Sequence, residues 1–396
     1  MSGKLSPNYS LFTLWIFHTT LVLLLAYINP NHYTTIDSQY YLESARNILE
    51  GNGYTILEEN GFLWNGTFPA GYSLAIAFVS FLTKTNVLWA SKIVNIGSAG
   101  ILFFFLNLWF GRNKSVLIAC IFFLGSFLKL WAHTWSEPLF LVILFGWTYH
   151  FNQINTEPEF SKSNFIYTFL LGIGLMFVRY AGIFIIPLSL CYSVYYFWKE
   201  EKQKSLVLIV LSVFWSAGFL FYIFLNYQNS GELFGGSRFD GNILITKNVI
   251  SFAKGLINET ALFGNTTFQS IDLLFLTGIS SQIFISILII KELKSHFALT
   301  NLNKSLFIIS SFYLVFLFVL RIFSHFDEPG YRLLAPFTFL FLCGIVCGIS
   351  DVQITVRLKN LLIVFVVFSC VEMIPKDGLV EKLAIIKCSK NEEITK

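Results

Sequence analysis

Long apolar runs separated by short polar turns occupy most of the 396-residue chain. A helix that crosses a bilayer needs about 20 consecutive, mostly apolar residues. The runs that approach this length are residues 11–30, 87–110, 114–132, 137–152, 164–179, 181–198, 205–225, 271–290, 305–323, 332–350 and 360–375. The pattern therefore predicts an all-α, polytopic integral membrane protein with about eleven transmembrane helices.

Residues 69–83 (PAGYSLAIAFVSFLT) are apolar but short for a span, and this length favours a juxtamembrane helix on the membrane surface. The basic residues support this interpretation, because Lys and Arg are enriched in turns on the cytoplasmic side. If this segment does not cross and the N-terminus is cytoplasmic, all the short basic turns fall inside. They contain Arg112 and Lys114, Lys162, Lys199, Lys202 and Lys204, Lys291, Lys294 and Lys304, and Arg357 and Lys359.

The same topology places the remaining polar segments on the outer face. The two large ones are a first outer loop, residues 31–86, which holds the surface helices, and a second outer loop, residues 226–270. The prediction is one transmembrane domain, residues 1–375, followed by a short polar C-terminal tail, residues 376–396. The first apolar run ends without a small-residue cleavage site, so we expect a retained span and not a removed signal peptide.

Composition agrees with this picture and narrows the function classes. Hydrophobic residues make up 55% of the chain and charged residues 13%, against about 25% charged in a typical soluble domain. A soluble enzyme and a disordered chain are both incompatible with these values. The net charge of +4 is too small to indicate a nucleic-acid partner. The six cysteines follow neither a disulfide pattern nor a zinc pattern.

Asp37 stands at the start of a stretch with helical periodicity, residues 34–54, which Gly51 and Gly53 close. In one interpretation Asp37 is the N-cap of a short amphipathic surface helix, and the glycines form its C-terminal stop. In the other, its carboxylate belongs to a functional site in the outer loop. The residues alone leave both interpretations open.

Glu137 precedes Pro138 at the mouth of an apolar run. The helix dipole favours a carboxylate at that position, which is a sufficient structural reason for it. An ionisable group at the edge of a membrane domain is also a candidate functional group. His133, in the same polar turn, either joins such a site or lies at the membrane interface.

Short motifs occur in a fixed order between residue 37 and about residue 336. They are Asp37 with Tyr40, Tyr41 and Ala45; Gly51-Asn52-Gly53-Tyr54; Pro69-Ala70-Gly71-Tyr72; Ser136-Glu137-Pro138-Leu139-Phe140; Arg179-Tyr180-Ala181-Gly182; and Tyr331-Arg332-Leu333-Leu334-Ala335-Pro336. This ordered set resembles the GT-C superfamily of membrane glycosyltransferases, in particular the dolichyl-phosphate-mannose protein mannosyltransferase-like group and the related lipopolysaccharide-core transferases. In that family the segment after the proline motif lies along the membrane, which agrees with the charge argument.

The resemblance implies transfer of a hexose, with inversion, from a lipid-linked sugar donor of the polyprenyl phosphate or diphosphate type. The acceptor would be a glycan, a lipid or a protein. Asp37 would be the general base that removes the acceptor proton. Cations would neutralise the leaving phosphate. The implied substrate-binding residues are Glu137, Arg179, Tyr180, Arg332 and Tyr72.

The chain departs from the family pattern at two points. Ala70 stands where the family often has a second proline, and Asp37 is followed by Ser38 instead of a second acid. The next acid is Glu43, so the second carboxylate is unassigned, and a divalent metal is a possible cofactor. Lys84 and Lys92 flank the surface segment and either help to neutralise charge or extend toward the interface.

Two other classes compete with an enzyme of the cell envelope. A transporter or flippase of a lipid-linked sugar would place ionisable residues near mid-membrane and contain inverted repeats. A catalytically inactive member of the fold would retain the motifs without the activity. The favoured interpretation is a multi-pass protein of the bacterial inner membrane, surrounded by lipid, with an active site that faces outward.

Overall fold

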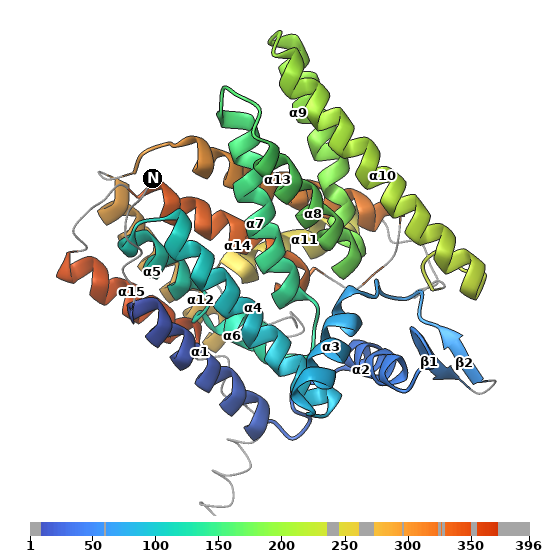
Figure 1. Ribbon diagram of the computed structural model, residues 1–396. Coiled ribbons are helices and arrows are strands. Elements are labelled where there is room, and N and C mark those ends of the chain that lie inside the picture. Colours follow the sequence, from blue (N-terminus) through green and yellow to red (C-terminus); the bar gives the residue numbers. More distant parts are fainter. Residues whose placement is uncertain are drawn as a thin grey trace, which may run out of the picture.

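The computed structural model describes residues 9–58, 61–235, 245–260, 273–294, 297–323, 326, 329–349 and 355–370. These residues form a bundle of helices with one small hairpin of strands (Figure 1). The helices are α1 (Tyr9–Ile28), α2 (Ile36–Leu49), α3 (Gly71–Thr83), α4 (Val87–Trp109), α5 (Arg112–Ile121), α6 (Gly125–Ala132), α7 (Glu137–Thr156), α8 (Lys162–Val178), α9 (Ile185–Trp198), α10 (Lys202–Ser230), α11 (Ile245–Thr260), α12 (Leu273–Leu293), α13 (Asn301–Phe323), α14 (Tyr331–Gly348) and α15 (Val356–Ser369). The strands are β1 (Thr55–Glu58) and β2 (Gly61–Trp64), and a 3₁₀ helix, η1 (Tyr180–Phe184), precedes α9.

Six of the described helical segments are long and apolar enough to cross a bilayer, and a seventh span results if α5 and α6 are counted together. The six are α1, α4, η1 with α9, α10, α13 and α14. The protein is therefore an all-α, polytopic integral membrane protein, as the hydrophobic pattern predicts.

The predicted number of eleven spans is not confirmed, although every predicted apolar segment contains a helix. The helices α8 and α15 have 17 and 14 residues, which is short for a hydrocarbon core of about 30 Å. The predicted span 114–132 is two helices, α5 and α6, that meet at an angle of 72°. Helix α7 carries buried amides at Asn152 and Asn155, which lower its hydropathy.

Helix α3 confirms the prediction that residues 69–83 are too short to cross. Its 13 residues span about 20 Å at 1.5 Å per residue. It packs through Tyr72 and Ile76 against Tyr41 of α2 and Ala90 of α4 in a small apolar cluster separate from the main core. Gly71 allows α3 to begin against the end of α8, because an ideal Cβ there would lie 2.5 Å from the Phe177 carbonyl oxygen.

The start of α2 differs from the prediction by two residues. Thr35 is the N-cap, and it forms a capping box with Ser38, so the interpretation of Asp37 as the N-cap is wrong. The predicted stop is confirmed, because Gly51 and Gly53 adopt φ angles of +85° and +78°.

The hairpin β1–β2 follows this stop and was not predicted, because four-residue strands leave almost no period-2 pattern to detect. Glu43 of α2 accepts a hydrogen bond of 2.6 Å from the Leu57 N–H on β1. Trp64 on β2 donates through its indole nitrogen to Asn226 of α10 at 3.0 Å. The hairpin is therefore fixed to both α2 and α10.

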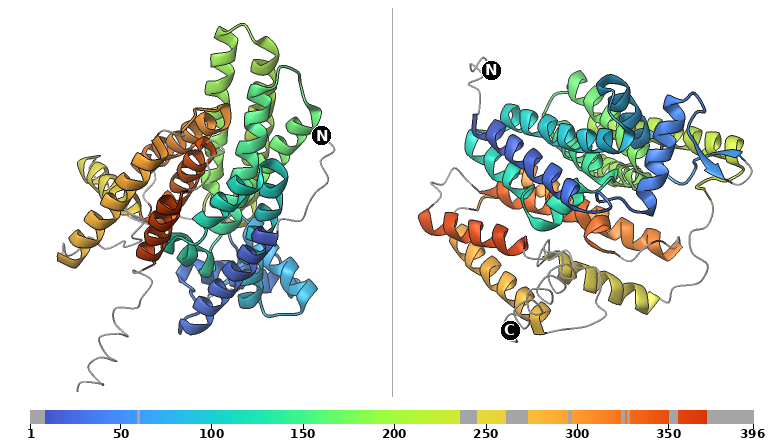
Figure 2. Two further views of the ribbon diagram at one scale, coloured as in Figure 1. Left: turned by 90° about the vertical axis from the view of Figure 1, so that its left-hand side faces the viewer. Right: turned by 90° about the horizontal axis from the view of Figure 1, so that it is seen from below.

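Figure 1 shows α2, α3 and the hairpin at one end of the bundle and the α9–α10 turn at the other. That turn contains Lys199 and Lys202, in keeping with a basic side opposite the first outer loop. Helix α7 lies inside the bundle and contacts α4, α8, α13 and α14. Figure 2 shows α12 and α15 at one edge, where they pack on each other. The first residue of the central helix α7 is Glu137.

Candidate active site

The polar turn between α6 and α7 is bonded to the segment that begins α2. The Thr134 N–H donates to the Tyr33 carbonyl at 3.1 Å, and the Ser38 hydroxyl donates to the Thr134 carbonyl at 2.9 Å. The Trp135 indole N–H donates to the hydroxyl of Thr35, the N-cap of α2, at 2.9 Å. Two stretches about a hundred residues apart are thus held side by side.

These bonds bring two acidic residues together. Asp37 precedes Ser38 in the first turn of α2, and Tyr41 lies one turn further on the same face. The Tyr41 hydroxyl is 3.1 Å from the hydroxyl of Ser136, the residue at the N-cap of α7. Glu137 is the next residue and begins α7, so its carboxylate lies beside α2 at the end of the buried helix.

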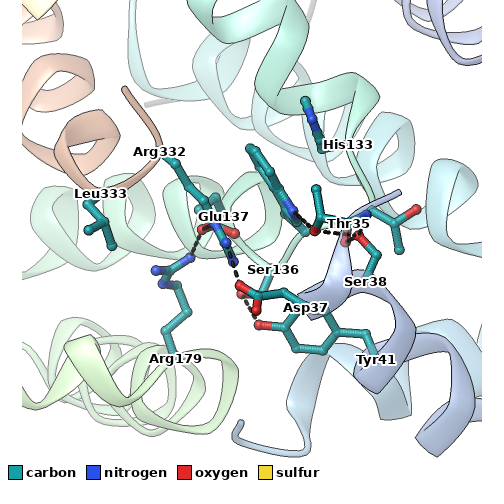
Figure 3. A network of polar contacts seen from close by, with 12 residues as sticks. Thr35, Asp37, Ser38, Tyr41, His133, Ser136, Glu137, Arg179, Arg332 and Leu333 are labelled. Carbon is teal, nitrogen blue, oxygen red and sulfur yellow. Dashed lines mark hydrogen bonds and ion pairs between the residues drawn. The ribbon is translucent and has the colours of Figure 1, made fainter. Parts of the chain in front are cut away.

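Arg332, the second residue of α14, joins the two carboxylates. Its Nη1 donates to Asp37 Oδ2 and its Nε donates to Glu137 Oε1. Its guanidinium lies 4.5 Å from the centre of the Trp135 ring, a cation–π distance. A second guanidinium, that of Arg179, forms an ion pair with the same Glu137 oxygen. Figure 3 shows both arginine side chains converging on Glu137, with Asp37 on the other side of Arg332.

Arg179 reaches the site because the chain leaves helical geometry at this residue. It lies between α8 and η1 with an extended backbone, at φ −149° and ψ 137°. Gly182 permits the tight return of the chain, because an ideal Cβ there would lie 2.5 Å from the Leu175 carbonyl carbon. The resemblance motif Arg179-Tyr180-Ala181-Gly182 is thus the break that aims a guanidinium at Glu137.

The four charged groups form a gradient of exposure. The side chain of Glu137 is 1% exposed, those of Arg179 and Arg332 are 13% and 18% exposed, and that of Asp37 is 24% exposed. Glu137 is therefore at the base and Asp37 nearest the solvent. Within the described residues, Oε2 of Glu137 makes no hydrogen bond. A buried acceptor without a partner is unusual in native proteins, so Glu137 is held in place through its other oxygen alone.

His133 is buried and takes part in none of the ion pairs of the described residues. Its ring stacks on Trp135 with centroids 3.7 Å apart, and its Nδ1 is 2.7 Å from the Lys129 carbonyl oxygen. Burial lowers its pKa to about 3, so the imidazole is neutral at physiological pH. Burial also raises the pKa of Tyr41 to about 12, so its hydroxyl stays protonated and can donate.

The two tyrosines predicted to bind substrate lie around the ion-pair network and bond to neighbouring segments. Tyr72 packs edge-on against Tyr41 at 5.1 Å, and its hydroxyl donates to Asn95 Oδ1 at 3.0 Å. The Tyr180 hydroxyl donates to the Gly66 carbonyl at 2.7 Å and accepts from Asn226 Nδ2 at 2.8 Å. Both tyrosines thus connect the first outer loop to the bundle.

Glu137 shares Arg332 with Asp37, whereas Glu43 is bonded to β1. In the described part of the chain, no three His, Cys, Asp or Glu side chains gather closely enough to hold a metal ion. A metal at this site would have to take Asp37 and Glu137 as ligands, and both carboxylates are bonded to arginines here. Lys84 is exposed and lies 4.4 Å from the Phe81 ring centre, consistent with an interfacial side chain.

Sequence reasoning did not identify Trp135, Ser136 and Thr134 as parts of the site. The available signal was the run of polar residues in His133-Thr134-Trp135-Ser136 between two apolar segments. Such a run is compatible with an ordinary exposed turn. What distinguishes it is that three of these side chains are less than 6% exposed.

The fold is similar to that of membrane proteins whose structures have been solved. Two crystal structures of ArnT from Cupriavidus metallidurans, one in the apo state and one bound to undecaprenyl phosphate, each align with 88% of this chain at TM-scores of 0.50 and 0.51. Sequence identity to both is 12%, and the chain spans 61% and 62% of the length of those proteins. No protein-family model matches the sequence, and none of the curated proteins matches it significantly.

Proposed function

We propose that the protein is a membrane glycosyltransferase that moves a sugar from a polyprenyl-phosphate-type lipid donor to an acceptor at the outer face of the bacterial inner membrane. The observation that carries this proposal is the network of Asp37, Arg332, Glu137 and Arg179 at the end of the bundle covered by the first outer loop. The fold supports it, since one ArnT structure with this fold was determined with undecaprenyl phosphate bound.

Asp37 is the general base of the proposed reaction. It is the most exposed member of the network, which lets an acceptor hydroxyl approach it. The acceptor oxygen attacks the anomeric carbon on the face opposite the phosphate. The bond from that carbon to the phosphate oxygen breaks, and the hydroxyl proton passes to Asp37. Attack from the opposite face inverts the anomeric configuration.

Arg332 and Arg179 stabilise the leaving phosphate. Guanidinium groups bind phosphate oxygens through paired, charge-assisted hydrogen bonds, which suit a leaving group that gains negative charge in the transition state. Glu137 holds both guanidiniums through one oxygen and is itself too buried to meet an acceptor. Its role is therefore to position the two cations, while Tyr72 and Tyr180 support the walls of the site.

A flippase of the lipid-linked sugar is the second candidate. Transporters place their ionisable residues near the middle of the membrane. Here Asp37 and Glu137 both lie at helix starts, at the end of the bundle where the first outer loop lies. This position favours chemistry at an interface over passage through the membrane. A catalytically inactive protein of the same fold would keep the network and transfer nothing.

The deciding experiment uses the purified full chain in liposomes with a radiolabelled polyprenyl-phosphate sugar. Transfer of label to a water-soluble or lipid acceptor supports the proposal. Movement of the intact donor between leaflets without cleavage of the sugar–phosphate bond overturns it in favour of a flippase. Neither cleavage nor movement, across donors with different sugars, overturns it in favour of an inactive protein.

A further inference from the structure

Lys92 is a buried lysine outside the ion-pair network. It lies in α4 with its side chain fully buried, and its Nζ donates to the Ala132 carbonyl at 2.6 Å and to the Thr134 hydroxyl at 2.9 Å. No carboxylate of the described residues lies within ion-pair distance of it. Burying a lysine amine is costly in free energy whether or not it carries its proton, because its contacts with water are lost and no counter-ion replaces them. The contacts of the Lys92 amine should therefore explain why this side chain is buried.

The side chain of Lys92 is part of a polar stripe on α4 that faces the turn between α6 and α7. Ser91 shares a hydrogen bond of 2.8 Å with the Thr134 hydroxyl. Asn95, one turn further along α4, donates to the Trp131 carbonyl at 3.1 Å and to the His133 carbonyl at 2.8 Å. Together with Lys92, the stripe satisfies the carbonyl groups of three successive residues at the C-terminal end of α6, where helix carbonyls have no partner within the helix.

Thr134 is the point at which this stripe connects to the candidate active site. Its hydroxyl accepts the Lys92 hydrogen bond, its carbonyl accepts from Ser38, and its N–H donates to Tyr33. Ser38 directly follows Asp37, and Glu137 lies three residues after Thr134. A displacement of Thr134 therefore moves the carboxylates of both Asp37 and Glu137. Glu137 is three residues away along the chain, and Asp37 is next to Ser38, which is bonded to Thr134.

We propose that Lys92 is a positioning residue that sets the distance between Asp37 and Glu137 by fixing Thr134. Its amine donates to two acceptors at once, the Ala132 carbonyl and the Thr134 hydroxyl, at the point where α6 ends. Its effect on turnover rests on the transferase function proposed above, whereas its effect on the geometry does not. Lys92 touches neither the acceptor nor the phosphate in this scheme and acts through Thr134.

The kinetic test compares Lys92→Met with Thr134→Val, Thr134→Ser and Lys84→Met. Misplacing a catalytic group by about 1 Å can cost about a hundredfold in rate, so Lys92→Met and Thr134→Val are expected to lower kcat by about this factor and to change donor KM little. Thr134→Ser keeps the hydroxyl and should retain wild-type kcat. Lys84→Met, in the exposed turn before α4, is the matched control and should match the wild type in both parameters.

Hydrogen–deuterium exchange supplies a readout that does not depend on activity. In Lys92→Met, peptides that cover residues 33–41 and 131–137 should both exchange faster, while peptides from α10 exchange as in the wild type. The same pattern is expected for Thr134→Val and not for Thr134→Ser. If Lys92→Met does not fold, the two Thr134 variants decide the question by themselves.

Wild-type kcat in a folded Lys92→Met protein overturns the proposal, and so does faster exchange confined to residues 131–137. If the wild-type protein transfers no sugar, the proposed function is wrong, but the exchange experiment still tests the proposed role of Lys92. The two proposals can therefore fail separately.

Discussion

Arg332 on α14 and Asp37 on α2 form an ion pair between residues 295 positions apart in the chain. This contact ties the penultimate described helix of the bundle to the first outer loop. It also places the candidate base in direct contact with a candidate phosphate ligand. The effects that we expect from substitutions in the site follow mainly from this pair and from the more deeply buried carboxylate of Glu137.

Replacing Asp37 by Asn should abolish most of the transfer activity. The amide keeps the size of the side chain and an oxygen that accepts a hydrogen bond from Arg332. It cannot take up the proton of the acceptor hydroxyl. General-base catalysis contributes typically about 10²- to 10⁴-fold, so kcat is expected to fall by about this factor. Steady-state kinetics with labelled donor check it. Glu50→Gln, in the exposed C-cap of the same helix, is the matched control, and an active Asp37→Asn enzyme would exclude Asp37 as the base.

Replacing Arg332 by Lys should weaken donor binding even though the charge is retained. The guanidinium bonds to Asp37 and Glu137 through different nitrogens, and an ammonium cannot reproduce that planar geometry. Loss of a hydrogen bond to a charged group costs about 1.5–3 kcal/mol, so donor KM should rise by about tenfold or more. Arg46→Lys, on the exposed side of α2, is the control. Unchanged donor KM would contradict a role for Arg332 in phosphate binding.

Replacing Glu137 by Gln should destabilise the protein as well as inactivate it. The carboxylate is 1% exposed and is shared by two arginines, so its removal leaves buried guanidinium charge without a counter-ion. Breaking a buried pair in this way costs about 3–5 kcal/mol. A lower midpoint of thermal unfolding, measured in detergent, is the expected result. The Asp37→Asn protein should lose less stability, because Asp37 is 24% exposed; equal losses would argue against this ranking.

His133 should make the protein acid-sensitive without taking part in the reaction. Its pKa is lowered by burial from 6.5 to about 3, so the unfolded chain binds a proton below pH 6.5 that the folded chain does not. Stability is therefore retained above pH 6.5 and falls as the pH drops toward 3, by at most about 1.4 kcal/mol per pH unit. His133→Asn should reduce this slope and leave the pH–rate profile above pH 7 unchanged. A changed profile there would give His133 a catalytic role.

Transfer should proceed in the presence of a chelator. Arg332 and Arg179 already place positive charge against Asp37 and Glu137, which is the charge that a divalent cation would supply. The rate with excess EDTA is expected to equal the rate with Mg²⁺ or Mn²⁺. Loss of activity that either cation restores would instead indicate that a metal replaces an arginine at the carboxylates when the donor binds.

The membrane class, the surface helix and the position of Glu137 could be predicted because each depends on local properties. The length of residues 69–83 predicts a helix shorter than a span, and α3 has only 13 residues. The start of α7 follows from Ser136-Glu137-Pro138, since proline favours the first turn of a helix.

The interactions of the site could not be predicted from local properties. Asp37 has the sequence context of an N-cap, and only the approach of α14 shows that its carboxylate bonds to Arg332 instead. Lys92 has the context of an interfacial lysine, yet it is fully buried. In both cases the partner comes from a distant segment, and pairing across that distance is decided by how the helices pack.

The sharing of one guanidinium between Asp37 and Glu137 has a consequence for the timing of the proposed reaction. As Asp37 takes up the acceptor proton it becomes neutral and its attraction for Arg332 weakens. At that same moment the phosphate oxygen acquires charge as it departs, and Arg332 is released to meet it. Nucleophile activation and leaving-group departure would then be synchronised by a single side chain that serves each in turn.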